Sequence, residues 1–225
     1  MNILLVAATE KELLPFMKRI SHQRYPAVAV HSVEHYSHSL SFLITGVGGV
    51  ATAVALSAHL VNNKYDLIIN VGIAGSFRNK YKIGDAVLVS EEIFADLGVE
   101  EADGRFLDLF EVGLVQLDSA PFDNGRMMVS ADLSAIKLPL VRAISVNRVH
   151  GSKESINSIV NKYDPDIESM EGAAFFYSCH CHNQVCMQLR TVSNFIEPRD
   201  REKWNIPLAI ESLAQSLDDI LRVLI

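Results

Sequence analysis

Two polar residues in the second half of the chain have the types and positions expected of a small-molecule site. Glu171 opens a predicted helix that is rich in small residues, and Asn194 follows a predicted buried strand. In α/β proteins both positions fall where strands end, and small molecules bind at that edge of the sheet. A carboxylate accepts hydrogen bonds, whereas an amide both donates and accepts them. The pair therefore predicts a pocket for a small polar molecule.

The three cysteines, Cys179, Cys181 and Cys186, lie in one cluster with His180 and His182. Zinc sites use paired ligands at characteristic spacings, and this run does not match them. The cluster also falls near the end of a predicted helix, where adjacent side chains point in different directions. We therefore expect ordinary thiols and surface histidines, with no bound metal and no cofactor.

The chain has 225 residues, of which 49% are hydrophobic, and this is enough apolar material for one large core. No linker of altered composition divides it, so we expect one domain spanning residues 1–225. The net charge of −7 and the lack of a basic stripe argue against nucleic-acid binding. No apolar run approaches the ~18 residues of a membrane span, and residues 3–8 indicate a buried strand, not a signal peptide. We therefore expect a cytoplasmic protein.

Apolar patterns alternate between strands and helices along most of the chain. Continuous apolar runs predict strands, and apolar spacings of three and four predict helices. The expected strands are residues 3–8, 26–33, 39–44, 67–71, 86–89, 141–146, 166–169 and 185–192. The expected helices are residues 11–20, 50–60, 153–163, 172–181 and 206–224. This alternation predicts an α/β fold whose parallel or mixed central sheet is covered by helices on both faces.

Glycines mark the ends of two predicted strands. Residues 45–49 (TGVGG) follow one strand and open a helix, and residues 70–75 (NVGIAG) end another strand. Such turns bring backbone N–H groups close to a ligand. The first spacing matches neither a Walker loop nor a full dinucleotide fingerprint, so a simple tight turn remains an alternative. Together the two turns predict a floor for a nucleoside-sized ligand.

Taken in order along the chain, these motifs resemble the nucleoside phosphorylase and nucleosidase superfamily. They are the two glycine turns, residues 83–87 (IGDAV), residues 170–173 (MEGA), Glu12 and residues 193–194 (SN). Within this superfamily the chain most resembles the futalosine hydrolases, because of residues 193–201 and Trp204. The resemblance covers nearly the whole chain. It implies a nucleoside phosphorylase-like fold and an enzyme whose partner is a small purine nucleoside.

The resemblance assigns the two carboxylates to water activation and sugar binding. Glu12 matches the family's water-activating residue, Glu171 matches the acid that holds the 2′- and 3′-hydroxyls, and Met170 fits the residue beneath the sugar. Each carboxylate also has a simpler explanation. Glu12 completes a Thr-x-x-Glu capping box with Thr9, a role compatible with catalysis, and Glu171 suits a helix N-terminus.

Asn194 separates this chain from relatives that act on adenine nucleosides. The related methylthioadenosine/S-adenosylhomocysteine nucleosidases carry Asp at this position, and Asp can give a proton to N7 of adenine. Asn cannot act as an acid, but its NH2 group suits the O6 and N7 acceptors of a 6-oxopurine. We therefore expect hypoxanthine as the leaving base, and we count Asn194 with Glu12 as catalytic. Without the other motifs, Asn194 would be interpreted as a turn residue.

Water, and not phosphate, is the expected nucleophile. Phosphorylases of the superfamily place an arginine and a serine for phosphate where this chain has Asn70 and Ile73. A phosphate would lose its bidentate cation there. The expected reaction is hydrolysis of futalosine to hypoxanthine and dehypoxanthine futalosine, in the alternative menaquinone route. The alternative is a methylthioadenosine/S-adenosylhomocysteine nucleosidase or a purine nucleoside phosphorylase.

The remaining expectations concern the walls of the pocket. We expect Gly48, Gly72 and Ile73 of the glycine turns to bind the substrate. Arg199 is expected near the 5′ side, where futalosine carries a benzoate that suits an arginine, although an exposed surface charge is the simpler alternative. The residue that stacks on the purine is not placed. Because the family relatives are homo-oligomers, we expect a homodimer or larger homo-oligomer, with the irregular residues 96–128 as a candidate interface.

Overall fold

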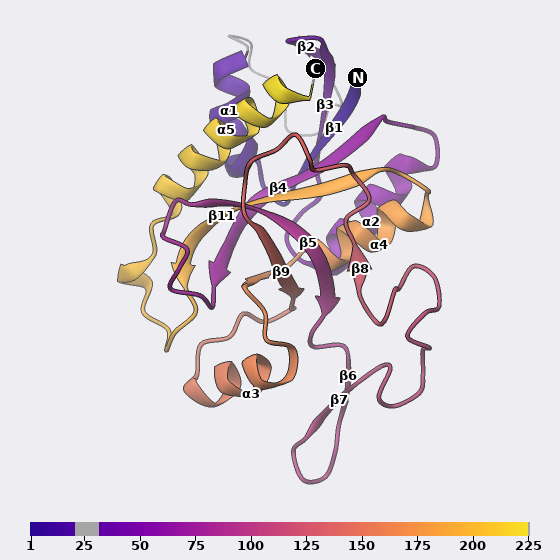
Figure 1. Cartoon of the computed structure of the whole chain (residues 1–225), viewed down its shortest axis with the longest axis vertical. Helices are drawn as coiled ribbons and strands as arrows, with labels where there is room; N and C mark the ends of the chain where they lie inside the picture. Colours follow the sequence, from indigo (N-terminus) through magenta and orange to yellow (C-terminus); the bar gives the residue numbers. More distant parts are fainter. Residues whose placement is uncertain (21–31, 225) are drawn as a thin grey trace.

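The central sheet forms the middle layer of the molecule, and helices pack on both of its faces (Figure 1). The computed structural model describes residues 1–20 and 32–224. Its strands are β1 (Asn2–Ala7), β2 (Val33–His35), β3 (His38–Ile44), β4 (Leu67–Ser76), β5 (Ala86–Phe94), β6 (Gly98–Glu100), β7 (Phe106–Asp108), β8 (Met127–Met128), β9 (Leu140–Ser145), β10 (Ile167–Ser169) and β11 (Cys186–Phe195). Its α-helices are α1 (Glu10–Ile20), α2 (Gly49–Leu60), α3 (Lys153–Tyr163), α4 (Gly172–Cys181) and α5 (Ile206–Val223). The predicted α/β fold is confirmed.

The sheet is mixed, and its strands lie in the order β10-β9-β5-β11-β4-β1-β3-β2. β1 pairs in parallel with β3 and β4, whereas β5 and β11 are antiparallel neighbours. β10 pairs with β9 on one side and with β4 on the other. The strands β10, β9, β5, β11 and β4 therefore close into a ring. This closure brings β4, β10 and β11 together, although they lie far apart in the sequence.

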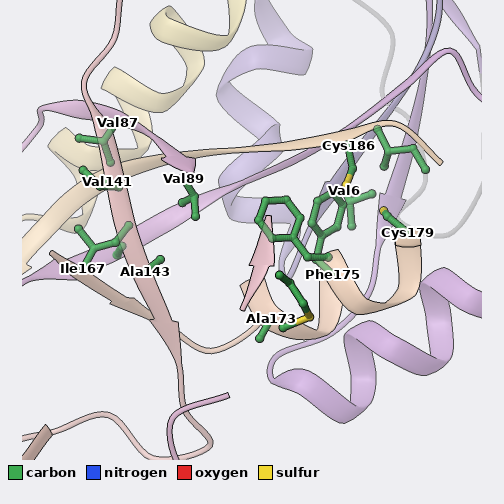
Figure 2. Packing of buried hydrophobic residues seen from close by; sticks show 14 of the residues in the cluster. Val6, Val87, Val89, Val141, Ala143, Ile167, Ala173, Phe175, Cys179 and Cys186 are labelled. Carbon is green, nitrogen blue, oxygen red and sulfur yellow. The ribbon is translucent and has the colours of Figure 1, made fainter. Parts of the chain in front are cut away.

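Each face of the sheet buries its own apolar cluster. Leu5 of β1 packs in the cluster that α1 and α5 cover, whereas the next residue, Val6, packs in the cluster that α2 and α4 cover. Figure 2 shows the second cluster, in which Phe175 of α4 lies near Val6 and Cys186. Phe175 is fully buried, and burial of such a side chain contributes roughly 1.5–3 kcal/mol. The two clusters hold α1 and α5 on one face of the sheet and α2 and α4 on the other.

The glycine segment at residues 70–75 differs from its prediction. β4 spans ten residues and continues to Ser76, so these residues are strand and not a turn. The glycines make room for neighbours, because a side chain at Gly72 would meet Arg190 and one at Gly75 would meet Ile196. The other segment does connect a strand to a helix: residues 45–48 join β3 to α2.

Helices α3 and α4 have the predicted bounds, whereas β5 continues to Phe94, five residues past its expected end, and β11 continues to Phe195, three residues past its expected end. Most of the strand expected at residues 26–33 lies outside the described residues, and Val33 begins the short strand β2. The irregular residues 96–128 include the β6–β7 hairpin, which projects away from the sheet (Figure 1), and the short strand β8. Within the described ranges, no helix is both long and apolar enough to span a membrane.

Candidate active site

A cavity of about 270 Å³ lies at the ends of β4, β10 and β11, beside the first residues of α1. Five of the expected site residues line it, namely Glu12, Ile73, Met170, Glu171 and Asn194. Its apolar walls include Val47, Val149, Ile196, Trp204, Ile206 and Ile210. The polar groups therefore gather within a largely apolar pocket, which is the usual composition of a small-molecule site.

Glu171 is held in the cavity by the turn that precedes α2. Its Oε1 accepts a hydrogen bond of 2.9 Å from the backbone N–H of Gly48. Gly48 has a φ of 91°, which favours glycine at this position. Although Glu171 directly precedes α4, its side chain does not cap that helix. The backbone N–H of Gly48, which we expected to face the ligand, thus orients Glu171 instead. Gly48 itself does not line the cavity.

Glu12 lies in the first turn of α1, and one of its oxygens is fixed by Thr9. Its Oε2 accepts hydrogen bonds from the backbone N–H of Thr9 at 2.9 Å and from the Thr9 hydroxyl at 3.0 Å. Burial raises the pKa of Glu12, while the Thr9 hydrogen bonds and the charge of Arg190 oppose that rise. A raised pKa brings a carboxylate closer to the range that suits a general base near neutral pH. The contact with Thr9 and a catalytic role are therefore compatible.

A buried arginine beside Glu12 was missed from the sequence. Arg190 of β11 is 2% exposed, and its Nη2 donates a 3.0 Å hydrogen bond to Gln188. Its charge also lowers the pKa of Glu92, a buried carboxyl whose pKa burial nevertheless raises to about 7. Gly72 permits this arrangement, because a Cβ there would lie 2.2 Å from Nη1 of Arg190 and 3.1 Å from Oε1 of Glu12. The available signal was a charged residue in the middle of a buried strand.

Asn194 follows a bulge in β11, where the register against β4 shifts between Val192 and Asn194. Neighbouring groups fix the orientation of its amide. Oδ1 accepts a 2.8 Å hydrogen bond from the Ser193 hydroxyl, and Nδ2 donates a 3.0 Å hydrogen bond to the carbonyl of Phe195. The second N–H of Nδ2 has no acceptor among the described residues. Asn194 lines the cavity, so this second N–H is a hydrogen-bond donor available to a ligand.

The cavity also contains a histidine–carboxylate pair that the sequence did not identify. His150 and Glu168 both line it, and their side chains are 14% and 2% exposed. Glu168 accepts hydrogen bonds from the backbone N–H of His150, at 3.0 Å, and from its Nδ1. The signal in the sequence was an acidic residue within the short predicted strand at 166–169. An acid there is unusual because strand residues beside a core are mostly apolar.

Arg199 lies beside the cavity and does not line it. Its guanidinium is 5.6 Å from the centroid of the Trp204 ring, and Trp204 does line the cavity. The cationic side chain that lines the cavity is Lys11 at the start of α1. The expected arginine on the 5′ side thus stacks on an aromatic ring, and a lysine that we did not consider faces the pocket.

Within the described ranges, no group of three or more His, Cys, Asp or Glu residues could hold a metal ion. Cys179 and Cys186 are buried and Cys181 is exposed, and all have free thiols.

Proteins of similar sequence match most of this chain. Residues 2–224 match the family model described as the Phosphorylase superfamily. The chain is 30% identical to futalosine hydrolase of Thermus thermophilus over 80% of each chain. It is 28% identical to futalosine hydrolase of Streptomyces coelicolor, over 88% of this chain and 84% of that one. It is 25% identical to a 5'-methylthioadenosine/S-adenosylhomocysteine nucleosidase of Maridesulfovibrio salexigens, over 86% of each chain.

Solved structures share the fold. Futalosine hydrolase of Helicobacter pylori superposes with a TM-score of 0.81 at 17% identity, over 99% of this chain and 97% of that one. A 5'-methylthioadenosine/S-adenosylhomocysteine nucleosidase of Neisseria meningitidis, in complex with methylthio-immucillin-A, superposes with a TM-score of 0.80 at 19% identity, over 98% of each chain. These likenesses confirm the predicted fold class.

Proposed function

The chain belongs to the phosphorylase superfamily, and from this premise we propose that it is an N-glycosyl hydrolase acting on futalosine. The products would be hypoxanthine and dehypoxanthine futalosine, an intermediate of the alternative menaquinone route. Two relatives named futalosine hydrolase, at 30% and 28% identity over most of the chain, support this substrate. The observation that carries the proposal is the amide of Asn194, which lines the cavity and has one N–H without an acceptor among the described residues.

The donor at Asn194 favours a 6-oxopurine over adenine. Hypoxanthine presents acceptors at O6 and N7, and either of them can accept the remaining N–H of Asn194. Adenine presents an amine at the same edge, and that amine would face another donor. A buried donor left without an acceptor costs about 1–3 kcal/mol, so this contact discriminates between the two bases.

Glu12 is the proposed base for the attacking water. Its Oε2 is occupied by Thr9, so Oε1 is the oxygen that takes the proton as water adds to the anomeric carbon. The electron pair of the N-glycosidic bond then passes to the purine. Glu171 is the proposed ribose ligand: Gly48 holds its Oε1, and Oε2 is left to accept from the sugar hydroxyls. Met170 would pack beneath the sugar, and Ile73 would contact the ribose from the cavity wall.

Water is favoured over phosphate because the nearby cation is already compensated. Arg190 is buried, and its charge acts on two carboxyls, Glu12 and Glu92, whose pKa values it lowers. A phosphate dianion would have to displace one of them from that charge. Asn70 and Ile73, at the positions that hold phosphate in the related phosphorylases, add no cation.

The test is to measure hypoxanthine release from futalosine with and without phosphate, beside inosine and methylthioadenosine. We expect futalosine to have the largest kcat/KM, and phosphate to leave the rate unchanged. A rate that requires phosphate would refute hydrolysis. Preference for methylthioadenosine would refute the role of Asn194, and preference for inosine would refute futalosine as the substrate.

We also propose that residues 1–225 form one nucleosidase domain that assembles as a homodimer or larger homo-oligomer in the cytoplasm. A second cavity of about 250 Å³ is lined by Val50 of α2 and by Met170, which also lines the first cavity. Val50 is 78% exposed and Val54 of the same helix is 66% exposed, so this apolar face suits a second copy of the chain. Free thiols are typical of a reducing compartment. Light scattering of wild type and Val54→Asp should show the assembly and its loss.

A further inference from the structure

Asn194 leaves the proposed reaction without an acid. When the N-glycosidic bond breaks, its electron pair moves onto the purine, which leaves readily only if a proton or strong hydrogen bonds meet that charge. An amide can donate a hydrogen bond but cannot transfer its proton. If a proton meets that charge, another group that lines the cavity has to supply it.

His150 and Glu168 form the pair with the chemistry to supply it. The Glu168 side chain is 2% exposed, and both of its oxygens bind His150, one at the backbone N–H and the other at Nδ1. These two contacts fix Glu168 against His150 and orient the imidazole. Nε2 of His150 has no hydrogen-bond partner among the described residues, and it is the ring nitrogen left for the cavity. A carboxylate at Nδ1 stabilises the protonated imidazole.

The sheet register places this pair across from Asn194. On β4, Gly75 is the partner of Glu168 from β10 on one side and of Asn194 from β11 on the other. Residues that pair directly across strands present their side chains on the same face. Two strand spacings separate Glu168 from Asn194, or about 9.5 Å between their backbones. The side chain of Ile196 lies against Gly75 and also lines the cavity, so a purine would bind beside Ile196, in the cavity that Asn194 and His150 share.

We propose that His150, oriented by Glu168, is the general acid that protonates the purine as it leaves. This inference rests on the proposed function, because it assigns a step of the same glycosidic cleavage. The proton on Nε2 passes to a purine nitrogen that receives the electron pair of the broken bond. Water adds to the anomeric carbon, and its proton passes to Glu12. Exchange of one proton from Glu12 to solvent and one from solvent to His150 restores the enzyme, and the sum is hydrolysis.

Other charged groups surround this step and define the expected pH profile. Glu12, Glu171 and Lys11 line the same cavity, and Arg199 packs against Gly151, the residue after His150. Imidazole is the side chain in this set that commonly loses its proton near neutral pH. The proposed steps need Glu12 ionised and His150 protonated, so loss of the first state should set the acid limb of kcat/KM and loss of the second should set the basic limb.

The experiment compares leaving groups that do and do not need a proton. Futalosine and 4-nitrophenyl β-D-ribofuranoside share the ribose, but 4-nitrophenolate leaves without protonation. His150→Asn should lower kcat for futalosine by about 100-fold or more and should remove the basic limb, while the nitrophenyl riboside loses less than about threefold. Glu168→Gln should move the basic limb to lower pH. His180→Asn, which replaces a histidine that hydrogen-bonds Met128 outside the cavity, is the matched control.

Several outcomes would overturn the inference. Equal losses on both substrates would make His150 a structural or sugar-binding residue, and an unchanged basic limb would show that another group is the acid. If His150→Asn does not fold, the basic limb of Glu168→Gln decides the question alone. If the wild type prefers inosine to futalosine, the substrate proposal fails, and the same comparison with inosine still tests His150. If no purine nucleoside is cleaved, both proposals fail.

Discussion

Replacing Asn194 by Asp tests the base-recognition argument at a single atom. Nδ2 of Asn194 donates to the Phe195 carbonyl at 3.0 Å. In Asn194→Asp an oxygen takes the place of Nδ2, so two acceptors face each other unless the new carboxyl keeps a proton. If it is protonated, that proton bonds to the Phe195 carbonyl. In either state the cavity loses the N–H donor that the 6-oxopurine requires.

The loss of this donor sets the expected magnitude. A buried acceptor left without its partner costs about 1–3 kcal/mol. At 1.4 kcal/mol for each factor of ten, kcat/KM for futalosine should fall by about 5- to 150-fold. The 6-amino analogue of futalosine carries a donor at that edge, so its kcat/KM should fall less or should rise. The ratio of the two specificity constants is therefore the quantity to measure.

Asn205→Asp is the matched control, because Asn205 caps α5 with its side-chain oxygen and does not line the cavity. Both variants should be compared with wild type by chemical unfolding, so that a change in specificity is separated from a change in stability. A ratio for Asn194→Asp within twofold of wild type, in a folded protein, would refute the role of Asn194. A comparable change in Asn205→Asp would show that the effect is not local to the cavity.

Three further predictions follow from the charges around the cavity. Glu12→Gln should lower kcat by about 10²- to 10⁴-fold while product binding stays measurable by calorimetry, and near-normal turnover would leave Glu12 as a helix cap only. Lys11→Met should raise KM more for futalosine, with its benzoate, than for inosine; equal changes would exclude Lys11 from the 5′ side. Burial raises the pKa of Glu92 to about 7, so its ionised form destabilises the fold as pH rises above the unfolded value near 4.5. In urea unfolding, the free energy of unfolding of Glu92→Gln should exceed that of wild type by up to ~3 kcal/mol at pH 8 and by little near pH 4.5. Equal differences at the two pH values would contradict this explanation.

The sequence was sufficient for the α/β class because apolar runs begin most of the strands of the sheet, although polar residues continue β5 and β11 beyond those runs. Helices α3 and α4 have the predicted bounds, since each begins and ends where its local pattern changes. The prediction of a turn at residues 70–75 was wrong, because it was based on two glycines that are instead part of β4. The glycines are instead required by side chains from elsewhere, Arg190 beside Gly72 and Ile196 beside Gly75. This requirement arises from tertiary contacts with residues far away in the sequence, so the local sequence pattern does not show it.

The site residues divide in the same way. Glu171 and Asn194, which line the cavity, were expected at a site because each lies at the end of an element, where sequence patterns are strongest. His150, Glu168 and Arg190 were missed because their partners are supplied by the closure of β10 onto β4 and by the pairing of β11 with β4. No spacing in the sequence shows that Glu168 and Asn194 flank the same glycine, so the acid of the reaction could be inferred only from the sheet register.

Gly72→Ala would show whether Arg190 acts on Glu12. A Cβ at this position would lie 2.2 Å from Nη1 of Arg190 and 3.1 Å from Oε1 of Glu12, so the guanidinium has to move. The charge of Arg190 lowers the pKa of Glu12, and its displacement should therefore raise that pKa further. We expect the acid limb of kcat/KM to move to higher pH and the rate at pH 6 to fall.

Gly49→Ala is the comparison for this variant, because a Cβ there meets its nearest neighbour, Ala174, at an ordinary 3.5 Å. It should leave the acid limb where the wild type has it. If Gly72→Ala folds and its acid limb stays in place, Arg190 does not set the charge state of Glu12. Arg190 would then serve only to compensate the buried carboxyl of Glu92. If Gly72 acts on Glu12 only through Arg190, the effects of substituting the two residues should not add. The double variant Gly72→Ala with Arg190→Met should move the acid limb little further than Gly72→Ala alone, because both changes remove the same charge from Glu12.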